Sequence, residues 1–225
     1  MPDYLIMDND TLAIHSNPLD PYFLKNPIKD GIITSSSTAL WRGYIAYFKF
    51  HGGKLIVDNI YTLSIVLNEQ TGTHHEKLTS IYSDIFGDVK NFECDFFTGV
   101  LICPFGDILE YVHMGYSSIY ENYKLIEVNN GNYIKEKEVD DKEFMKLKIR
   151  HYEHFKKTPE YKKLLAETIE HSKKADEDIK KYFDDLSDDD MTPIKKTSKK
   201  DRIKSAEDFL FFYLTDNIKT IDISD

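Results

Sequence analysis

The sequence predicts an α+β protein, in which a mainly antiparallel β-sheet module with one packed helix is followed by a helical-hairpin extension. All ten glycines lie between residues 31 and 131, and none follows. Before residue 138, apolar and aromatic runs alternate with turn sequences, as in strands. Beyond it the chain is rich in lysine and glutamate, with apolar residues every three or four positions. We therefore place a β-rich domain at 1–138 and an α-helical extension at 139–225.

The first strands are predicted at residues 4–7, 44–50 and 54–66. The last two form a hairpin, because Gly52-Gly53 between them tolerates the positive φ angles of a two-residue turn. The strand period of two places Tyr44, Ala46, Phe48 and Phe50 on one face with Leu55, Val57 and Tyr61. Arg42 extends this face, so we expect its side chain to point toward an apolar layer.

Residues 74–86 are predicted to form the helix that packs on the sheet. Leu78, Ile81, Tyr82 and Ile85 recur at helical spacing, and Gly87 ends the pattern.

A second hairpin is predicted from residues 95–103 and 107–114 around the turn Pro104-Phe105-Gly106. In this register Tyr111 lies over Gly99, and Asp95 is the diagonal neighbour of His113 on one face. A loop of four residues would shift the register and remove the relation between Asp95 and His113.

The remaining elements are a third hairpin and three helices. Strands at 119–128 and 133–139 flank Asn129-Asn130-Gly131-Asn132, a strong turn signal. Helices are expected at 140–157, at 159–186 after an N-cap at Thr158, and at 206–214. A polar stretch near 187–200, acidic and then lysine-rich, is interpreted as a linker.

Composition limits the classes of function. The net charge of -10 disfavours general nucleic-acid binding, which needs a basic surface. No apolar run reaches the roughly 18 residues of a membrane span, and the first residues do not resemble a secretory signal. The only two cysteines, Cys94 and Cys103, fit a reducing compartment. We expect a cytoplasmic protein.

The leading candidate site is Trp41-Arg42. Trp41 is the only tryptophan, and Arg42 is the only arginine before residue 150. Arginine offers a planar, permanently charged fork that binds phosphate or carboxylate through two hydrogen bonds. Arg42 is therefore either an anion clamp, stacked on Trp41 or Tyr44, or a structural residue paired with Asp95 or Glu110.

A second candidate surrounds the predicted hairpin at 95–114. Asp95 and His113 could form a carboxylate-oriented general base, although no nucleophile is specified beside them. The nearby tyrosines either line a ligand pocket or cover a sheet edge. The predicted ligand-binding residues are Trp41, Arg42, Tyr44, Tyr111, His113 and Tyr116.

No cofactor motif is present, and His74 and His75 have no partner at standard zinc spacing. His151 and His154 lie three apart on a predicted helix, a spacing that permits a shared metal, but the apolar stripe indicates that His151 packs in a groove.

Four phrases together resemble a group of small bacterial cytoplasmic proteins without an assigned activity. They are Ser16-Asn17-Pro18-Leu19 with Tyr22-Phe23, Trp41-Arg42-Gly43-Tyr44-Ile45-Ala46, Asp95-Phe96-Phe97-Thr98-Gly99 and Tyr111-Val112-His113-Met114-Gly115-Tyr116. The resemblance covers residues 12–135 and omits the helical extension. It implies a bacterial or phage setting and carries over no catalytic role.

Three functional hypotheses follow. The first is a non-enzymatic binding protein, whose β-rich module recognises an anionic small ligand or a protein partner and whose helices mediate self-association or partner contact. The second is a phosphate-directed hydrolase or transferase using Arg42, Asp95 and His113. The third is an immunity- or antitoxin-like protein whose acidic surface blocks a basic partner. We expect binding rather than catalysis.

Overall fold

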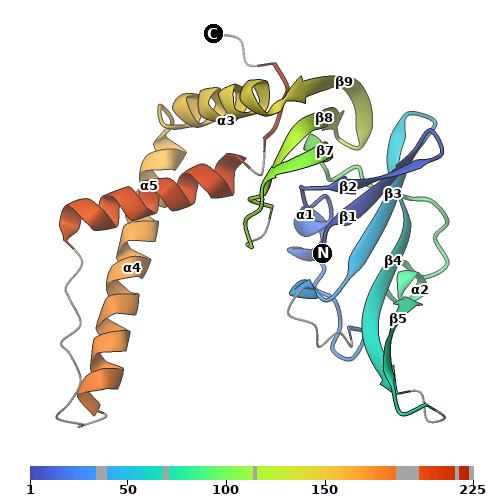
Figure 1. Cartoon of the computed structure of the whole chain (residues 1–225), viewed down its shortest axis with the longest axis horizontal. Coiled ribbons are helices and arrows are strands. Elements are labelled where there is room, and N and C mark those ends of the chain that lie inside the picture. Colours follow the sequence, from blue (N-terminus) through green and yellow to red (C-terminus); the bar gives the residue numbers. More distant parts are fainter. Residues whose placement is uncertain (34–39, 68–70, 114–115, 186–197, 216–217, 223–225) are drawn as a thin grey trace. The chain divides into compact units, whose positions relative to one another are not determined.

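The computed structural model describes residues 1–33, 40–67, 71–113, 116–185, 198–215 and 218–222. It confirms the α+β class, with a nine-stranded, mostly antiparallel sheet followed by long helices (Figure 1). The chain divides into two compact units. The sheet unit comprises Met1–Met145 with Asn217–Asp225, and the helical unit comprises Lys146–Asp216.

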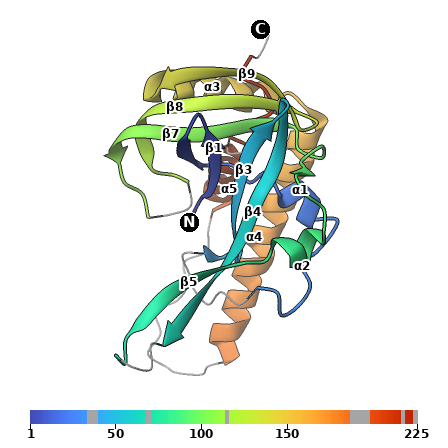
Figure 2. The same cartoon turned by 90° about the vertical axis from the view of Figure 1, so that its right-hand side faces the viewer.

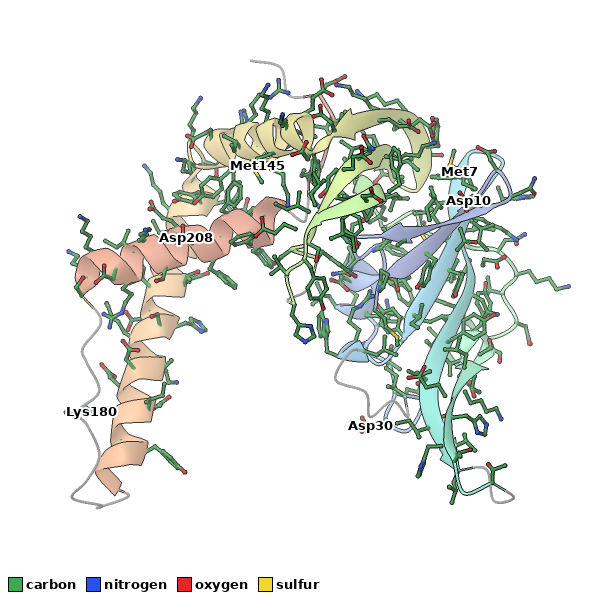
Figure 3. The ribbon with its side chains drawn as sticks, viewed as in Figure 1. Met7, Asp10, Asp30, Met145, Lys180 and Asp208 are labelled. Carbon is green, nitrogen blue, oxygen red and sulfur yellow. The ribbon has the colours of Figure 1, made fainter. Side chains whose placement is uncertain are left out.

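The sheet unit contains all of the described strands. Seven strands follow the spatial order β2-β1-β3-β4-β9-β8-β7, while β5 and β6 pair with β4. All these pairings are antiparallel except that of β1 with β3. The strands are β1 (Asp3–Met7), β2 (Asp10–Ile14), β3 (Ile45–His51), β4 (Lys54–Leu67), β5 (His74–Ser80), β6 (Phe92–Glu93), β7 (Gly99–Glu110), β8 (Ile119–Asn129) and β9 (Asn132–Asp140). Figure 3 labels Met7 and Asp10, which pair at the turn between β1 and β2.

The sheet curls until its two end strands meet. The His15 amide, directly after β2, donates a hydrogen bond to the Ile102 carbonyl of β7 at 2.7 Å. Beside it, the Val100 amide donates to Ile218 at 2.9 Å, so the end of the chain also joins β7. The curled sheet encloses the main core, against which the short helices α1 (Asp20–Phe23) and α2 (Tyr82–Phe86) place aromatic side chains.

The hairpin at Gly52-Gly53 is confirmed, with its predicted inward face largely intact. Tyr44, Ala46, Phe48, Leu55 and Val57 all belong to the main core. Tyr61 was predicted on this face, and that prediction is wrong. A register shift between Tyr47 and Phe48 reverses the phase, so Tyr61 instead contacts Tyr47, with ring centroids 5.6 Å apart.

The helix predicted at residues 74–86 is wrong for most of its length. Residues His74–Ser80 form β5, which pairs with β4 from Leu67 to Tyr61, and only Tyr82–Phe86 is helical. The long strand β4 offers these residues a full set of backbone partners. Such a tertiary pairing overrides a local apolar spacing of three and four.

The hairpin predicted around Pro104-Phe105-Gly106 is also wrong. Strand β7 continues through these residues and pairs with β8, so Cys103 lies opposite Lys124 rather than Asp107. Gly106 has a φ of 81°, and the register shifts between Phe105 and Ile108, which indicates a bulge and not a reversal. The predicted contact of Tyr111 over Gly99 is therefore absent.

The last hairpin and the helices agree with the sequence. Strands β8 and β9 meet at the predicted turn, with positive φ angles at Asn130 and Gly131. The helices are α3 (Asp141–Phe155), α4 (Pro159–Asp185) and α5 (Lys199–Thr215); Figure 3 labels Lys180 on α4 and Asp208 on α5. The Thr158 hydroxyl accepts the Tyr161 amide at 3.2 Å, which confirms the predicted N-cap.

The helical unit has its own small core. Tyr152, Tyr161 and Leu210 are buried there, with Phe155 and Phe211 packed against them. Helix α5 begins seven residues earlier than predicted, and most of the predicted linker, residues 187–197, lies outside the described residues. Among the described helices, none combines the length and apolarity needed to cross a bilayer.

Both cysteines are free, buried thiols. Burial raises the pKa of Cys94, and it raises the pKa of Cys103 to about 12. Because the thiolate is the reactive form, we expect iodoacetamide at pH 8 to modify both at least about 100-fold more slowly in the native protein than in urea. Mass spectrometry over a time course measures this. Rapid native labelling of either cysteine would contradict its burial.

Candidate functional site

Arg42 forms a buried ion pair with Asp3, the first residue of β1. The two guanidinium nitrogens donate to the two carboxylate oxygens, Nη1 to Oδ2 at 2.8 Å and Nη2 to Oδ1 at 3.1 Å. The side chains are 5% and 0% exposed. Oδ1 of Asp3 also accepts the Ala46 amide at 2.8 Å, so one carboxylate joins β1, β3 and the turn that precedes β3. The predicted partners, Asp95 and Glu110, are wrong.

Aromatic and polar side chains complete the surroundings of Arg42. Its guanidinium carbon lies 5.0 Å from the centre of the Tyr44 ring, a cation–π arrangement. The Nη2 atom of Arg42 also donates to the Tyr116 hydroxyl at 3.5 Å, and that hydroxyl donates to Oδ1 of Asn17 at 3.1 Å. The Tyr116 ring stacks on His15 with centroids 4.7 Å apart. Three of the predicted ligand-binding residues, Arg42, Tyr44 and Tyr116, are thus brought together.

The electrostatics of this cluster show that the positive charge is neutralised within the chain. Burial raises the pKa of Asp3 and acts to lower that of Arg42. The charge and hydrogen bonds of Asp3 outweigh burial at Arg42, whose pKa lies above its usual value. Paired charge-assisted hydrogen bonds of this geometry are strong, and they occupy the fork that would otherwise hold an anion. The geometry supports the structural interpretation of Arg42.

Trp41 lies apart from this network. Its side chain is 79% exposed, whereas the preceding Leu40 is buried against Ile45 and Leu63. Arg42 therefore stacks on Tyr44 and not on Trp41. The tryptophan is left as an exposed apolar side chain next to a buried ion pair.

Asp95 and His113 are not brought together. Asp95 is exposed before the start of β7, whereas His113 is exposed beyond its other end. The twelve residues of β7 separate them by roughly 40 Å of strand. His113 instead has its Nδ1 atom 2.9 Å from the hydroxyl of Tyr111, which is also exposed. The predicted carboxylate–imidazole pair, and the catalytic mechanism that depended on it, are contradicted.

The end of β7 and the residue that follows it expose a group of large apolar side chains, of which the sequence had indicated only Tyr111 as a site residue. We call Phe105, Ile108, Leu109 and Tyr111 the β7 tip; they are 37%, 53%, 55% and 69% exposed. The prediction had turned this segment back onto Leu101. The adjacent pair Ile108-Leu109 was the available signal, because two neighbouring strand residues point to opposite faces and both are apolar.

The side chains of the described residues do not form a metal site. Within them, no three histidine, cysteine, aspartate or glutamate side chains gather in a way that could hold a metal ion. No family model, curated protein or solved structure matches the chain. The function is therefore inferred from the residues of this chain alone.

Proposed function

We propose that this chain is a binding protein whose β-rich module recognises a protein partner through the β7 tip. The observation that carries the proposal is the exposure of the neighbouring residues Ile108 and Leu109 of β7, each of which is more than half exposed. Exposed apolar clusters of this kind mark interaction sites. A partner that covers both side chains would remove this apolar surface from water.

The state of Arg42 favours a protein partner over an anionic small ligand. Its guanidinium already binds the carboxylate of Asp3 through two hydrogen bonds. An external anion at this position would have to displace Asp3, which is completely buried. Leaving that carboxylate unpaired in the interior is strongly unfavourable.

The Arg42 cluster has a supporting role in this proposal. Tyr116 follows the β7 tip in the chain, and its hydroxyl bonds to Arg42 and Asn17. These contacts fix Tyr116 before the start of β8. A residue held in place before binding loses less conformational entropy when the partner arrives.

The cellular setting is part of the same proposal. We place the protein in a reducing cytoplasm, since its two buried thiols are unpaired. The bacterial or phage setting rests on the resemblance over residues 12–135 alone. Self-association through the C-terminal helices stays a prediction. Neither the cellular setting nor self-association changes the result expected for the β7 tip.

Affinity purification from the native host tests the proposal. The double variant I108S/L109S removes the two most apolar side chains of the tip at positions where the native side chains are already half exposed. We expect the wild-type chain to retain one protein in stoichiometric amount and the variant to lose it. With the purified pair, calorimetry should show binding weakened about 30-fold or more, as for truncated central interface residues.

A matched control is available on β4. Ile65 and Leu67 are 55% and 50% exposed, so I65S/L67S changes the same residue types at similar exposure. We expect this control to keep the partner. Equal retention by I108S/L109S and the wild type would contradict the proposed role of the β7 tip.

A further inference from the structure

The outer edge of β7 changes from paired to open at Pro104. On the first half of the strand, Val100 and Ile102 bond to Ile218 and His15 across this edge. Pro104, which has no amide hydrogen to donate, marks the end of that contact, as expected for an edge position. From residue 105 to residue 110 the strand pairs with β8 on one side, and the described residues supply no strand on the other.

The open edge has the dimensions of one strand. Six residues span about 20 Å, the length of an average strand in globular proteins. Register shifts between Phe105 and Ile108, and between Ile108 and Glu110, twist this stretch and limit the length of strand that can pair with it. Figure 2 shows β7 and β8 lying side by side.

The charge around this edge has a single sign. Residues 105–123 contain Asp107, Glu110 and Glu121, and no lysine or arginine. All three acidic side chains are exposed, and a Cβ atom on Gly106 would lie 2.8 Å from the Glu121 carboxylate, which places that carboxylate at the bulge. Interfaces match opposite potentials, so this edge fits a basic partner.

The edge formed by β5 differs in the same respect. Strand β5 carries Lys77 beside His74 and His75, and Leu78 is its only large apolar residue. Lysine on an edge strand protects it against pairing with another chain. The β7 edge lacks this protection and combines apolar side chains with negative charge.

We propose that the partner contributes an extended segment of alternating apolar and basic residues, which adds to the open edge of β7 as a further strand. This inference rests on the proposed function and specifies the chemistry of the partner. Main-chain hydrogen bonds to residues 105–110 would provide the docking, as in other cases of strand addition. The apolar side chains would cover Ile108 or Leu109, and the lysines or arginines would meet Asp107, Glu110 and Glu121.

Synthetic peptides and the full chain test this chemistry. The probe is a fluorescently labelled eight-residue peptide of alternating lysine and valine. One comparison peptide replaces lysine by glutamate, and another carries N-methyl groups on every second amide, which removes one hydrogen-bonding edge. Fluorescence anisotropy measures affinity, and amide NMR shifts locate the bound peptide.

We expect saturable binding of the lysine–valine peptide, with shift changes concentrated in residues 105–111 and in β8 opposite them. N-methylation and the change to glutamate should each weaken binding at least about 10-fold. The neutralised triple variant D107N/E110Q/E121Q should weaken it to a similar degree. The control triple D30N/D88N/D178N removes the same charge from exposed positions elsewhere and should bind as the wild type does.

The possible failures are distinguishable. No saturable binding at millimolar peptide, or shifts outside this edge, would overturn the strand-addition inference. Equal binding of the lysine and glutamate peptides, with loss in I108S/L109S, would overturn the basic partner while supporting the apolar site. Affinity unchanged in I108S/L109S would count against the proposed function itself.

Discussion

The Arg42→Ala variant is expected to lose about 3–5 kcal/mol of folding free energy, because it leaves the Asp3 carboxylate buried without its cation. That carboxylate is inaccessible to solvent and would keep only the Ala46 amide as a hydrogen-bond donor. The variant also removes the cation above the Tyr44 ring. The loss approaches the total stability of many domains, so we expect reduced soluble yield as well.

Urea denaturation followed by far-UV circular dichroism measures this effect, with amide NMR signals of β1 and β3 reporting on the sheet unit. Arg150→Ala is the control, since Arg150 is exposed on α3 and its removal should change stability by less than about 0.5 kcal/mol. The double variant D3N/R42M removes both charges, keeps an oxygen that can accept the Ala46 amide, and should recover most of the loss. An Arg42→Ala protein as stable as the wild type but unable to bind its partner would show that Arg42 acts in recognition.

The Gly131→Ala variant is expected to lose about 3 kcal/mol or more, because the new methyl group would collide with backbone. A Cβ at this position would lie 2.9 Å from the Cys94 carbonyl oxygen and 3.1 Å from the Asp95 Cα atom. The turn has little freedom to move away from these atoms, since the Gly131 amide donates to the Phe97 carbonyl at 3.0 Å and the Gly131 carbonyl accepts the Leu55 amide at 2.7 Å. The turn therefore links β4, the segment before β7, and the β8–β9 hairpin.

Gly53→Ala separates the collision from the conformational effect. Gly53 has a φ of 79°, close to the 75° of Gly131, but no atom lies within 4 Å of the position that an alanine Cβ would take there. We expect this variant to lose only about 1 kcal/mol, the cost of holding alanine at positive φ. The difference between the two denaturation midpoints isolates the steric contribution. Similar losses for both variants would show that the backbone around Gly131 relaxes.

The elements that the sequence predicted well are those with local signals. The turns at Gly52-Gly53 and Asn130-Gly131, and the N-cap at Thr158, depend on residues a few positions apart. The predictions for residues 74–80 and 104–110 were wrong because a partner strand distant in sequence decided the structure of each segment. Their local apolar spacing and turn residues were compatible with the predicted helix and hairpin, and the available strands β4 and β8 overrode them.

The candidate site likewise combines features that local sequence indicates with features that only distant contacts decide. Strand periodicity predicted that Arg42 turns inward, and its side chain is buried, but Arg42 lies in the turn before β3, where the strand period does not apply. Periodicity could not identify the counter-ion, because Asp3 lies 39 residues away and reaches Arg42 only through the parallel pairing of β1 with β3. Likewise the β7 tip emerged only once β7 was seen to continue past Gly106.

By itself the sequence determined the α+β class and the places of the strongest turns, since each follows from the chemistry of neighbouring residues. The tertiary structure alone decided which carboxylate neutralises Arg42, that Asp95 and His113 lie at opposite ends of β7, and which apolar residues remain exposed. These depend on strand order and register, which are fixed by long-range backbone pairing and by the packing of the core.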